Sequence, residues 1–81
     1  MKVTIKMFAS FREVTGSPES QIDIANGTTV GQLWDSLVED YPRLRPLSQS
    51  SAFALNGRYT QPDQPLHDGD TVAFLPPVSG G

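Results

Sequence analysis

The sequence contains no cysteine, a single histidine and no long hydrophobic run. Without cysteine, the chain cannot form a disulfide scaffold, a thiolate-ligated zinc or iron–sulfur site, or a thiol nucleophile. One histidine cannot build a histidine-rich metal cage, and no segment approaches the roughly 20 apolar residues that span a bilayer. The start of the sequence also lacks the apolar segment of a secretory signal. These absences favour a cytoplasmic protein without a membrane partner.

Positive charge is scarce, with six Lys and Arg against nine Asp and Glu and a net charge of −3. The cations are scattered rather than gathered in a stripe that could neutralise phosphates, which argues against a nucleic-acid partner. The 81 residues suffice for one domain with a thin core. Seven Gly and seven Pro indicate frequent turns, and therefore strands rather than a helical bundle.

Hydrophobic alternation with period two predicts four strands. They cover residues 2–8, 21–24, 52–56 and 71–75. Asn56-Gly57 is a hairpin-turn signal after the third strand, which leaves room for a short additional strand. The last strand is expected beside the first and parallel to it.

One amphipathic helix is predicted over residues 29–41, where apolar residues recur at the spacing of a single helical stripe. Thr29 and Gln32 fit a capping box at its start, and Pro42 stops it. Trp34 lies on the stripe and is expected in the core.

The remaining segments are predicted to be connections. Residues 9–16 are expected to form a short loop or a single helical turn, and residues 43–51 a polar loop. Asp68-Gly69-Asp70 indicates a turn in which Asp forms local backbone hydrogen bonds and Gly takes a positive φ. A turn explains these carboxylates better than a metal site does, and His67 beside them is expected to be a solvated loop residue.

The order of these elements is the plan of the β-grasp fold. We therefore predict an α+β domain whose mixed sheet of four to five strands packs on one main helix. The domain is expected over residues 1–77, with a flexible tail over residues 78–81. No oriented group of nucleophile, base and acid is predicted inside the domain, so the sequence does not place an active site there.

The end of the sequence has a more specific pattern. Pro76 and Pro77 fix two φ angles directly after the last strand, and Gly80 and Gly81 then remove every side chain. Such a tail can enter a channel too narrow for a Cβ atom. Six residues reach about 20 Å when extended, which suits delivery of a terminal carboxylate into the active site of another protein.

Three features together resemble the ubiquitin-like sulfur-carrier family, and within it the small subunits of molybdopterin synthase. They are the β-grasp order, the Phe-Ala-x-x-Arg-Glu segment that begins at Phe8, and the ending from Val72 to Gly81. The resemblance covers the whole chain in length and order. Leu75 departs mildly from it, since an aromatic residue would also be at home there, and residues 43–59 carry no motif.

The resemblance implies a carrier cycle at Gly81. A ubiquitin-activating-like adenylyltransferase would use ATP to form an acyl-adenylate on its carboxylate, and a sulfur donor protein would convert the adenylate into a thiocarboxylate. The sulfur would then enter a cyclic pyranopterin precursor to form the dithiolene of molybdopterin, in molybdenum cofactor biosynthesis.

The resemblance also implies a non-catalytic role in an enzyme complex, a heterotetramer with the large subunit of molybdopterin synthase. The carrier would hold no permanent cofactor and no metal. The tail residues that would thread into the large subunit are Pro76, Pro77, Val78, Ser79 and Gly80.

Strand parity predicts a docking surface beside the tail. Phe8 and Leu75 have the opposite parity to the inward residues of their strands, and Tyr59 follows the hairpin turn. These three side chains are expected to form an exposed apolar patch on the outer face of the sheet, and such patches commonly mark interaction sites. The resemblance adds Arg12 to the partner-binding residues.

Three other functions stay open at this point. The chain could be the sulfur carrier of thiamin thiazole synthesis, or a ubiquitin-like modifier that passes Gly81 to a lysine. It could also be a β-grasp interaction domain, for which removal of the two final glycines would change nothing.

Overall fold

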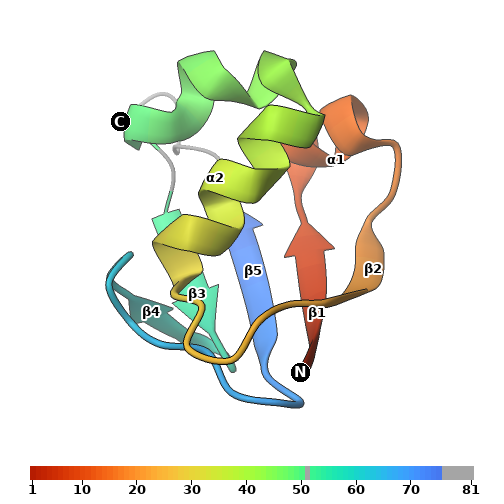
Figure 1. Ribbon diagram of the computed structural model, residues 1–81. Coiled ribbons are helices and arrows are strands. Elements are labelled where there is room, and N and C mark those ends of the chain that lie inside the picture. The colour runs from red at the N-terminus through yellow and green to blue at the C-terminus, as the bar shows by residue number, and fades with distance from the viewer. Residues whose placement is uncertain (51, 76–81) are drawn as a thin grey trace.

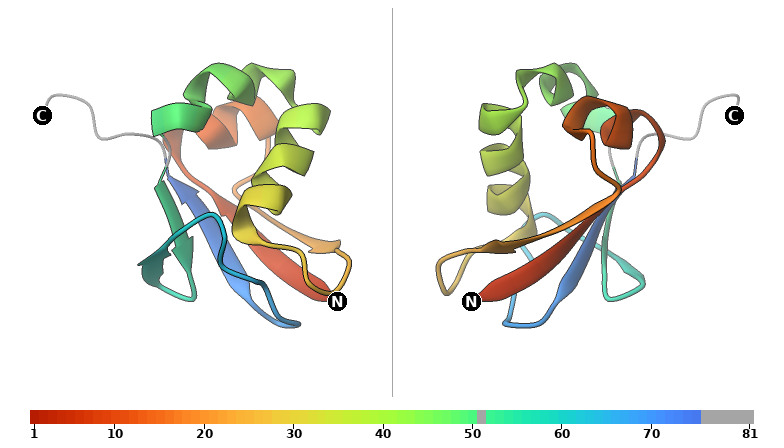
Figure 2. Two further views of the ribbon diagram at one scale, coloured as in Figure 1. Left: turned by 60° about the vertical axis from the view of Figure 1, so that its left-hand side comes forward. Right: turned by 90° about the vertical axis from the view of Figure 1, so that its right-hand side faces the viewer.

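The computed structural model describes residues 1–50 and 52–75, which form a five-stranded sheet with helices against one face (Figures 1 and 2). The elements in chain order are β1 (Lys2–Met7), α1 (Ala9–Thr15), β2 (Glu19–Asp23), α2 (Val30–Asp40), the 3-10 helix η1 (Pro42–Ser50), β3 (Ala52–Leu55), β4 (Arg58–Thr60) and β5 (Thr71–Leu75). The strand order is β2-β1-β5-β3-β4, in which only β1 and β5 run parallel. The predicted β-grasp architecture is confirmed, with the short extra strand present as β4. Among the described residues, no helix is both long and apolar enough to cross a membrane.

Helix α2 forms because its capping and its apolar stripe agree. The Thr29 side chain accepts from the Gln32 N–H at 3.2 Å, and the Gln32 side chain accepts from the Thr29 N–H at 2.9 Å. This reciprocal pair is the predicted capping box. The helix ends at Asp40, directly before Tyr41 and Pro42, so the predicted helix is confirmed with one residue fewer at each end, where Thr29 and Tyr41 are the caps.

The core lies between α2 and the inner face of the sheet, with Trp34 at its centre. The Trp34 ring lies 5.2 Å from Phe11 of α1 and 5.1 Å from Phe74 of β5, measured between centroids. Phe53 of β3 lies 6.0 Å away, so one side chain joins three other elements. Aromatic pairs at this spacing add stabilisation beyond that of the buried area alone.

The predicted polar loop over residues 43–51 is wrong, because residues 42–50 form the helix η1. The Leu44 N–H donates to the Tyr41 carbonyl at 2.9 Å, and the Leu44 side chain is fully buried. The polar residues around Leu44 hid this buried anchor, so the sequence showed no apolar period there. Residues 9–16 likewise form more than one helical turn, and Gly16 ends α1 with a φ of 79°.

The Asp68-Gly69-Asp70 segment forms the predicted turn, but only Asp70 makes the predicted local backbone bond, whereas Asp68 bonds to the distant strand β1. Asp68 Oδ1 accepts from the Lys2 N–H at 2.8 Å, and Asp70 Oδ2 accepts from the His67 N–H at 2.8 Å. Gly69 has a φ of 87°, and its N–H donates to the Lys2 carbonyl at 2.8 Å. The turn therefore fixes the start of β1 against the start of β5.

Candidate docking surface beside the tail

Within residues 1–50 and 52–75, no helix covers the outer face of the sheet, which carries two different surfaces (Figure 2). Over β2 and β1 it is charged, with Lys2 opposite Asp23 and Lys6 opposite Glu19. Over β5, β3 and β4 it is apolar, as the alternation of inward and outward residues requires. The residues of this outer apolar patch are Phe8, Ala52, Ala54, Tyr59, Ala73 and Leu75.

Strand register arranges the patch in two rows. Ala73 pairs with Ala54, which pairs with Tyr59, and Leu75 pairs with Ala52. Residues that face each other across strands share one face of the sheet. The small alanine side chains thus form a shallow floor between Leu75 and Tyr59.

Phe8 stands at the end of β1 in an unusual position. Met7 pairs with Phe74, and Phe8 keeps an extended backbone, so the register brings Phe8 next to Leu75. Phe8 is also the N-cap residue of α1 and forms no side-chain capping bond. Ser, Thr, Asp and Asn are preferred there because they satisfy a helix N–H. The Phe8 side chain forms no such bond and is 44% exposed, so it is accessible to a partner at this surface.

The structure thus brings together only part of the predicted group. Phe8 and Leu75 are neighbours, whereas Tyr59, which is 81% exposed, lies on the far side of the alanine floor. Leu75 is half-buried rather than fully exposed, and Arg12 is exposed on α1, four residues after Phe8. The sequence reasoning missed the three alanines, although their alternation with Phe53, Leu55, Val72 and Phe74 could have identified them.

The predicted tail residues Pro76, Pro77, Val78, Ser79, Gly80 and Gly81 lie outside the described residues. The described chain ends at Leu75, inside the outer apolar patch.

The fold and this surface define a ubiquitin-like β-grasp protein. The chain is similar to small archaeal modifier protein 1 from Haloferax volcanii, with a TM-score of 0.83, 31% identity and full coverage of both chains. The chain belongs to the ThiS family, whose model matches residues 5–81.

Two further comparisons narrow the class within that family. The molybdopterin synthase sulfur carrier subunit of Mycobacterium tuberculosis is 40% identical over 100% of this chain and 99% of its own length. A protein–protein complex of subunits 1 and 2 of the molybdopterin-converting factor from Helicobacter pylori contains a similar chain. That chain has a TM-score of 0.70 and 26% identity, with 100% of both chains covered. The chain is therefore a ubiquitin-like member of the ThiS family that is similar over its full length to a molybdopterin synthase sulfur carrier subunit.

Proposed function

We propose that this protein is the sulfur-carrier subunit of a molybdopterin synthase and carries sulfur as a thiocarboxylate on Gly81. The single observation that carries the proposal is its full-length similarity to a molybdopterin synthase sulfur carrier subunit. The Gly80-Gly81 ending and the patch beside Leu75 support it, because they provide a slender tail and a surface for gripping a partner.

The Gly81 carboxylate is a poor electrophile, because resonance delocalises its charge, and it must therefore be activated first. An oxygen of the Gly81 carboxylate attacks the α-phosphate of ATP on an activating enzyme, which releases pyrophosphate and leaves an acyl-adenylate. A persulfide sulfur of a donor protein displaces AMP, and a thiol reductant cleaves the resulting acyl disulfide to leave the thiocarboxylate. Its sulfur then attacks a carbon of the pyranopterin precursor and displaces an oxygen leaving group, which gives a thioester between carrier and precursor. Water cleaves the acyl–sulfur bond of this thioester, so the sulfur stays on the product and the carrier leaves with its carboxylate restored.

In this cycle the two subunits have different roles. The acid–base groups and the substrate pocket belong to the large subunit, which receives the tail while it docks on the outer apolar patch. A dithiolene contains two sulfur atoms, so two loaded carriers are consumed for each product.

The test is intact-mass spectrometry of the 81-residue chain after incubation with a ubiquitin-activating-type enzyme, ATP and a sulfur source. We expect one oxygen to be replaced by one sulfur at Gly81, and no replacement in a variant that lacks Gly81. Adding the loaded carrier to the large subunit and the precursor should return the carboxylate form. Absence of sulfur loading would contradict the proposal.

A second candidate is a covalent protein modifier, which the similarity to the H. volcanii modifier protein favours. It shares the adenylate but passes Gly81 to a lysine amine instead of a sulfur. Gly81 in isopeptide linkage to other proteins, found by peptide mass spectrometry, would support this function.

A further inference from the structure

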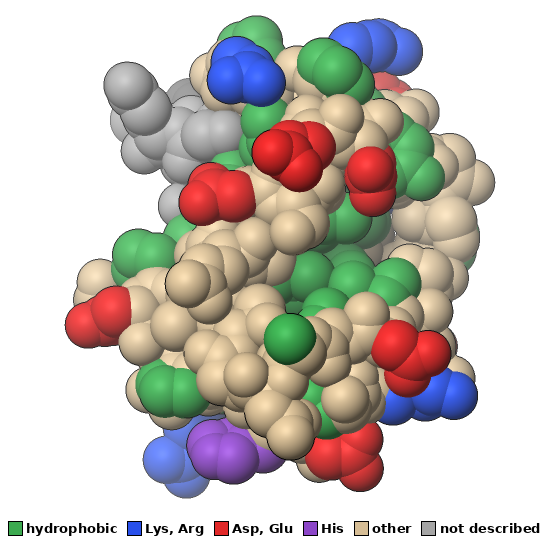
Figure 3. Space-filling view, viewed as in Figure 1, with side chains coloured by type: hydrophobic (Ala, Val, Ile, Leu, Met, Phe, Trp, Pro, Cys, Tyr) green, Lys and Arg blue, Asp and Glu red, His purple; other side chains and the backbone are tan. Residues whose placement is uncertain are grey.

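A groove opens on the opposite side of the molecule from the outer apolar patch, between β2 and α2. Its sheet side is formed by Ile5, Met7, Ser20 and Ile22, and its helix side by Leu37, Asp40 and Tyr41. Figure 3 shows hydrophobic side chains at the floor of this hollow, with acidic side chains near its rim.

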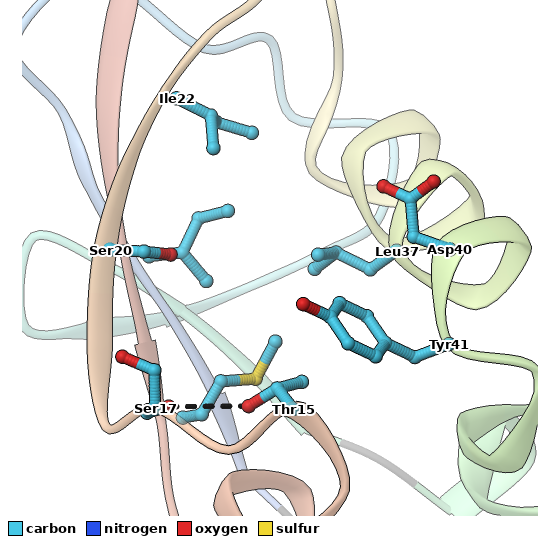
Figure 4. A pocket seen from close by; sticks show the side chains of 9 residues that line it. Thr15, Ser17, Ser20, Ile22, Leu37, Asp40 and Tyr41 are labelled. Carbon is cyan, nitrogen blue, oxygen red and sulfur yellow. Dashed lines mark hydrogen bonds between the residues drawn. The ribbon is translucent and has the colours of Figure 1, made fainter.

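One end of the groove is closed by the connection between α1 and β2. There the Thr15 hydroxyl donates to the Ser17 carbonyl at 3.2 Å (Figure 4). Leu37 and Tyr41 point across the groove toward the strands (Figure 4). The cavity measures about 160 Å³, well below the usual range for sites that enclose a small-molecule ligand. It is large enough for one or two side chains of a peptide.

The groove lies along the edge strand β2, whose backbone has pairing capacity on its outer side. Met1 exchanges two hydrogen bonds with Ile24, at 2.8 Å each, and the Met7 N–H donates to the Pro18 carbonyl at 2.9 Å. The alternation of an antiparallel ladder then directs the backbone groups of Ile22 and Ser20 toward β1.

The same alternation points the N–H and C=O groups of Gln21 and Asp23 away from β1. No strand of the described part of the chain pairs with that side of β2. An added strand would extend the sheet there and place every second side chain over the groove, which is the geometry of peptide recognition by strand addition.

The charges on β2 and at the groove rim indicate what kind of chain can bind there. A second copy pairing through its own β2 in antiparallel register about Gln21 would place Glu19 directly opposite the Asp23 of the other copy, twice. Like charges directly opposite each other destabilise a strand pair. Asp40 adds a further negative charge at the rim, and the last turn of α2 carries no basic residue. The β2 edge therefore disfavours a copy of this chain in this register, and the acids on its outer face together with Asp40 at the groove rim favour a basic segment.

We propose that this edge and groove bind an extended segment of a partner protein in which apolar residues alternate with polar ones. Two lysines or arginines four residues apart would face Asp23 and Glu19, and two apolar side chains between them would enter the groove. The protein's own β1 has this pattern, since Lys2 and Lys6 face the same two acids from the other side of β2. The site does not depend on the proposed sulfur chemistry.

The test uses the capped peptide Gly-Lys-Val-Thr-Ile-Lys-Gly, with a matched control in which both lysines are replaced by glutamate. Titration followed by amide and methyl NMR should perturb Glu19, Gln21, Asp23 and the Ile22 and Leu37 methyl groups, with binding that saturates below about 1 mM. The glutamate peptide should bind at least about tenfold more weakly. The proposal would be overturned by perturbation centred on Ala54 and Ala73, or by equal affinity for both peptides. Binding that does not saturate, or dimerisation of the chain, would also overturn it.

Gln21→Pro isolates the backbone contact. Proline removes the outward N–H of Gln21 but no bond to β1, a position where an edge strand tolerates it. We expect about tenfold weaker peptide binding, while the matched variant Gln21→Thr, which keeps the N–H, binds normally. Unchanged binding by folded Gln21→Pro would overturn the strand-addition geometry.

Two controls keep the test decisive. If Gln21→Pro does not fold, Glu19→Gln with Asp23→Asn provides the second comparison and should abolish the preference for the lysine peptide. Retention of that preference would overturn the assigned charge contacts. Sulfur loading of Gly81 should be unchanged in these variants, which separates the groove from the tail.

Discussion

Asn56 and Asp70 are linked by a side-chain hydrogen bond of 2.9 Å, from Asn56 Nδ2 to Asp70 Oδ1. Asn56 Oδ1 also accepts from the Thr71 N–H at 2.9 Å. The bonds join the turn between β3 and β4 to the entry of β5, across 14 residues of sequence. They fix the register of the strand that carries the tail, so an apparently generic hairpin turn helps to set where the tail begins.

Replacing Asp70 should therefore destabilise the fold more than replacing its neighbour Asp68. Asp70→Ala removes acceptors for Asn56 and for the His67 N–H, whereas Asp68→Ala removes one exposed acceptor. We expect Asp70→Ala to lower the free energy of unfolding by about 2 kcal/mol and Asp68→Ala by about 1 kcal/mol or less. Urea denaturation measures both. Equal losses would contradict the larger structural role assigned to Asp70.

Phe8 should matter for binding and not for folding. Phe8→Ala is expected to weaken docking to the large subunit by roughly thirtyfold, as truncation of an aromatic anchor typically does. Phe8→Ser supplies a proper N-cap to α1 and should raise the free energy of unfolding by about 1 kcal/mol over Phe8→Ala while it still binds weakly. Binding titration and thermal melting of both variants provide the test, and a large loss of stability with normal binding would identify Phe8 as a core residue.

Binding should also be sensitive to substitutions in the alanine floor of the outer apolar patch. Ala54→Glu places a charge between Ala73 and Tyr59, where docking would bury it, and should weaken binding by at least about tenfold. Thr4→Glu places the same charge on the polar half of the same face and is the matched control. Surface plasmon resonance against the large subunit compares them. Equal effects would mean that the partner does not distinguish the two halves.

A substitution at Gly80 tests the role of the tail separately from that of the outer apolar patch. Gly80→Ala adds one methyl group near the carboxylate and should hinder entry into a narrow channel, so that sulfur transfer to the precursor slows. Melting should stay unchanged, because the change lies beyond the last strand. Measuring the rate of sulfur transfer tests this prediction. An unfolded variant would show instead that Gly80 belongs to the folded domain.

The sequence was sufficient wherever a local rule and the overall fold agree. Thr29 and Gln32 satisfy a short-range capping pattern, and β5 has the predicted bounds because it is central and alternates strictly. The sequence was insufficient where a structural feature depends on residues far apart in the chain or on a few buried atoms. Leu44 is a buried anchor in a polar stretch, and the groove brings together Ser20 and Tyr41, whose proximity no local spacing encodes.

Gly31 provides a case in which helix propensity and packing oppose each other. Gly→Ala inside a helix normally stabilises it by up to about 1 kcal/mol. A Cβ at Gly31, however, would lie 3.0 Å from both the Cβ and the carbonyl oxygen of Pro62. The same oxygen accepts from the Gly31 N–H at 2.8 Å, so the two segments cannot separate without losing that bond.

We therefore expect Gly31→Ala to lower the free energy of unfolding by about 1 kcal/mol, because crowding of a packed contact typically costs more than the gain in propensity. Ser36→Ala, at an exposed position of the same helix, is the control and should raise it by a few tenths of a kcal/mol. Urea denaturation of both variants distinguishes the two effects. If Gly31→Ala were as stabilising as Ser36→Ala, the loop at Pro62 would have to shift without cost, and its hydrogen bond to α2 would not help to hold the helix on the sheet.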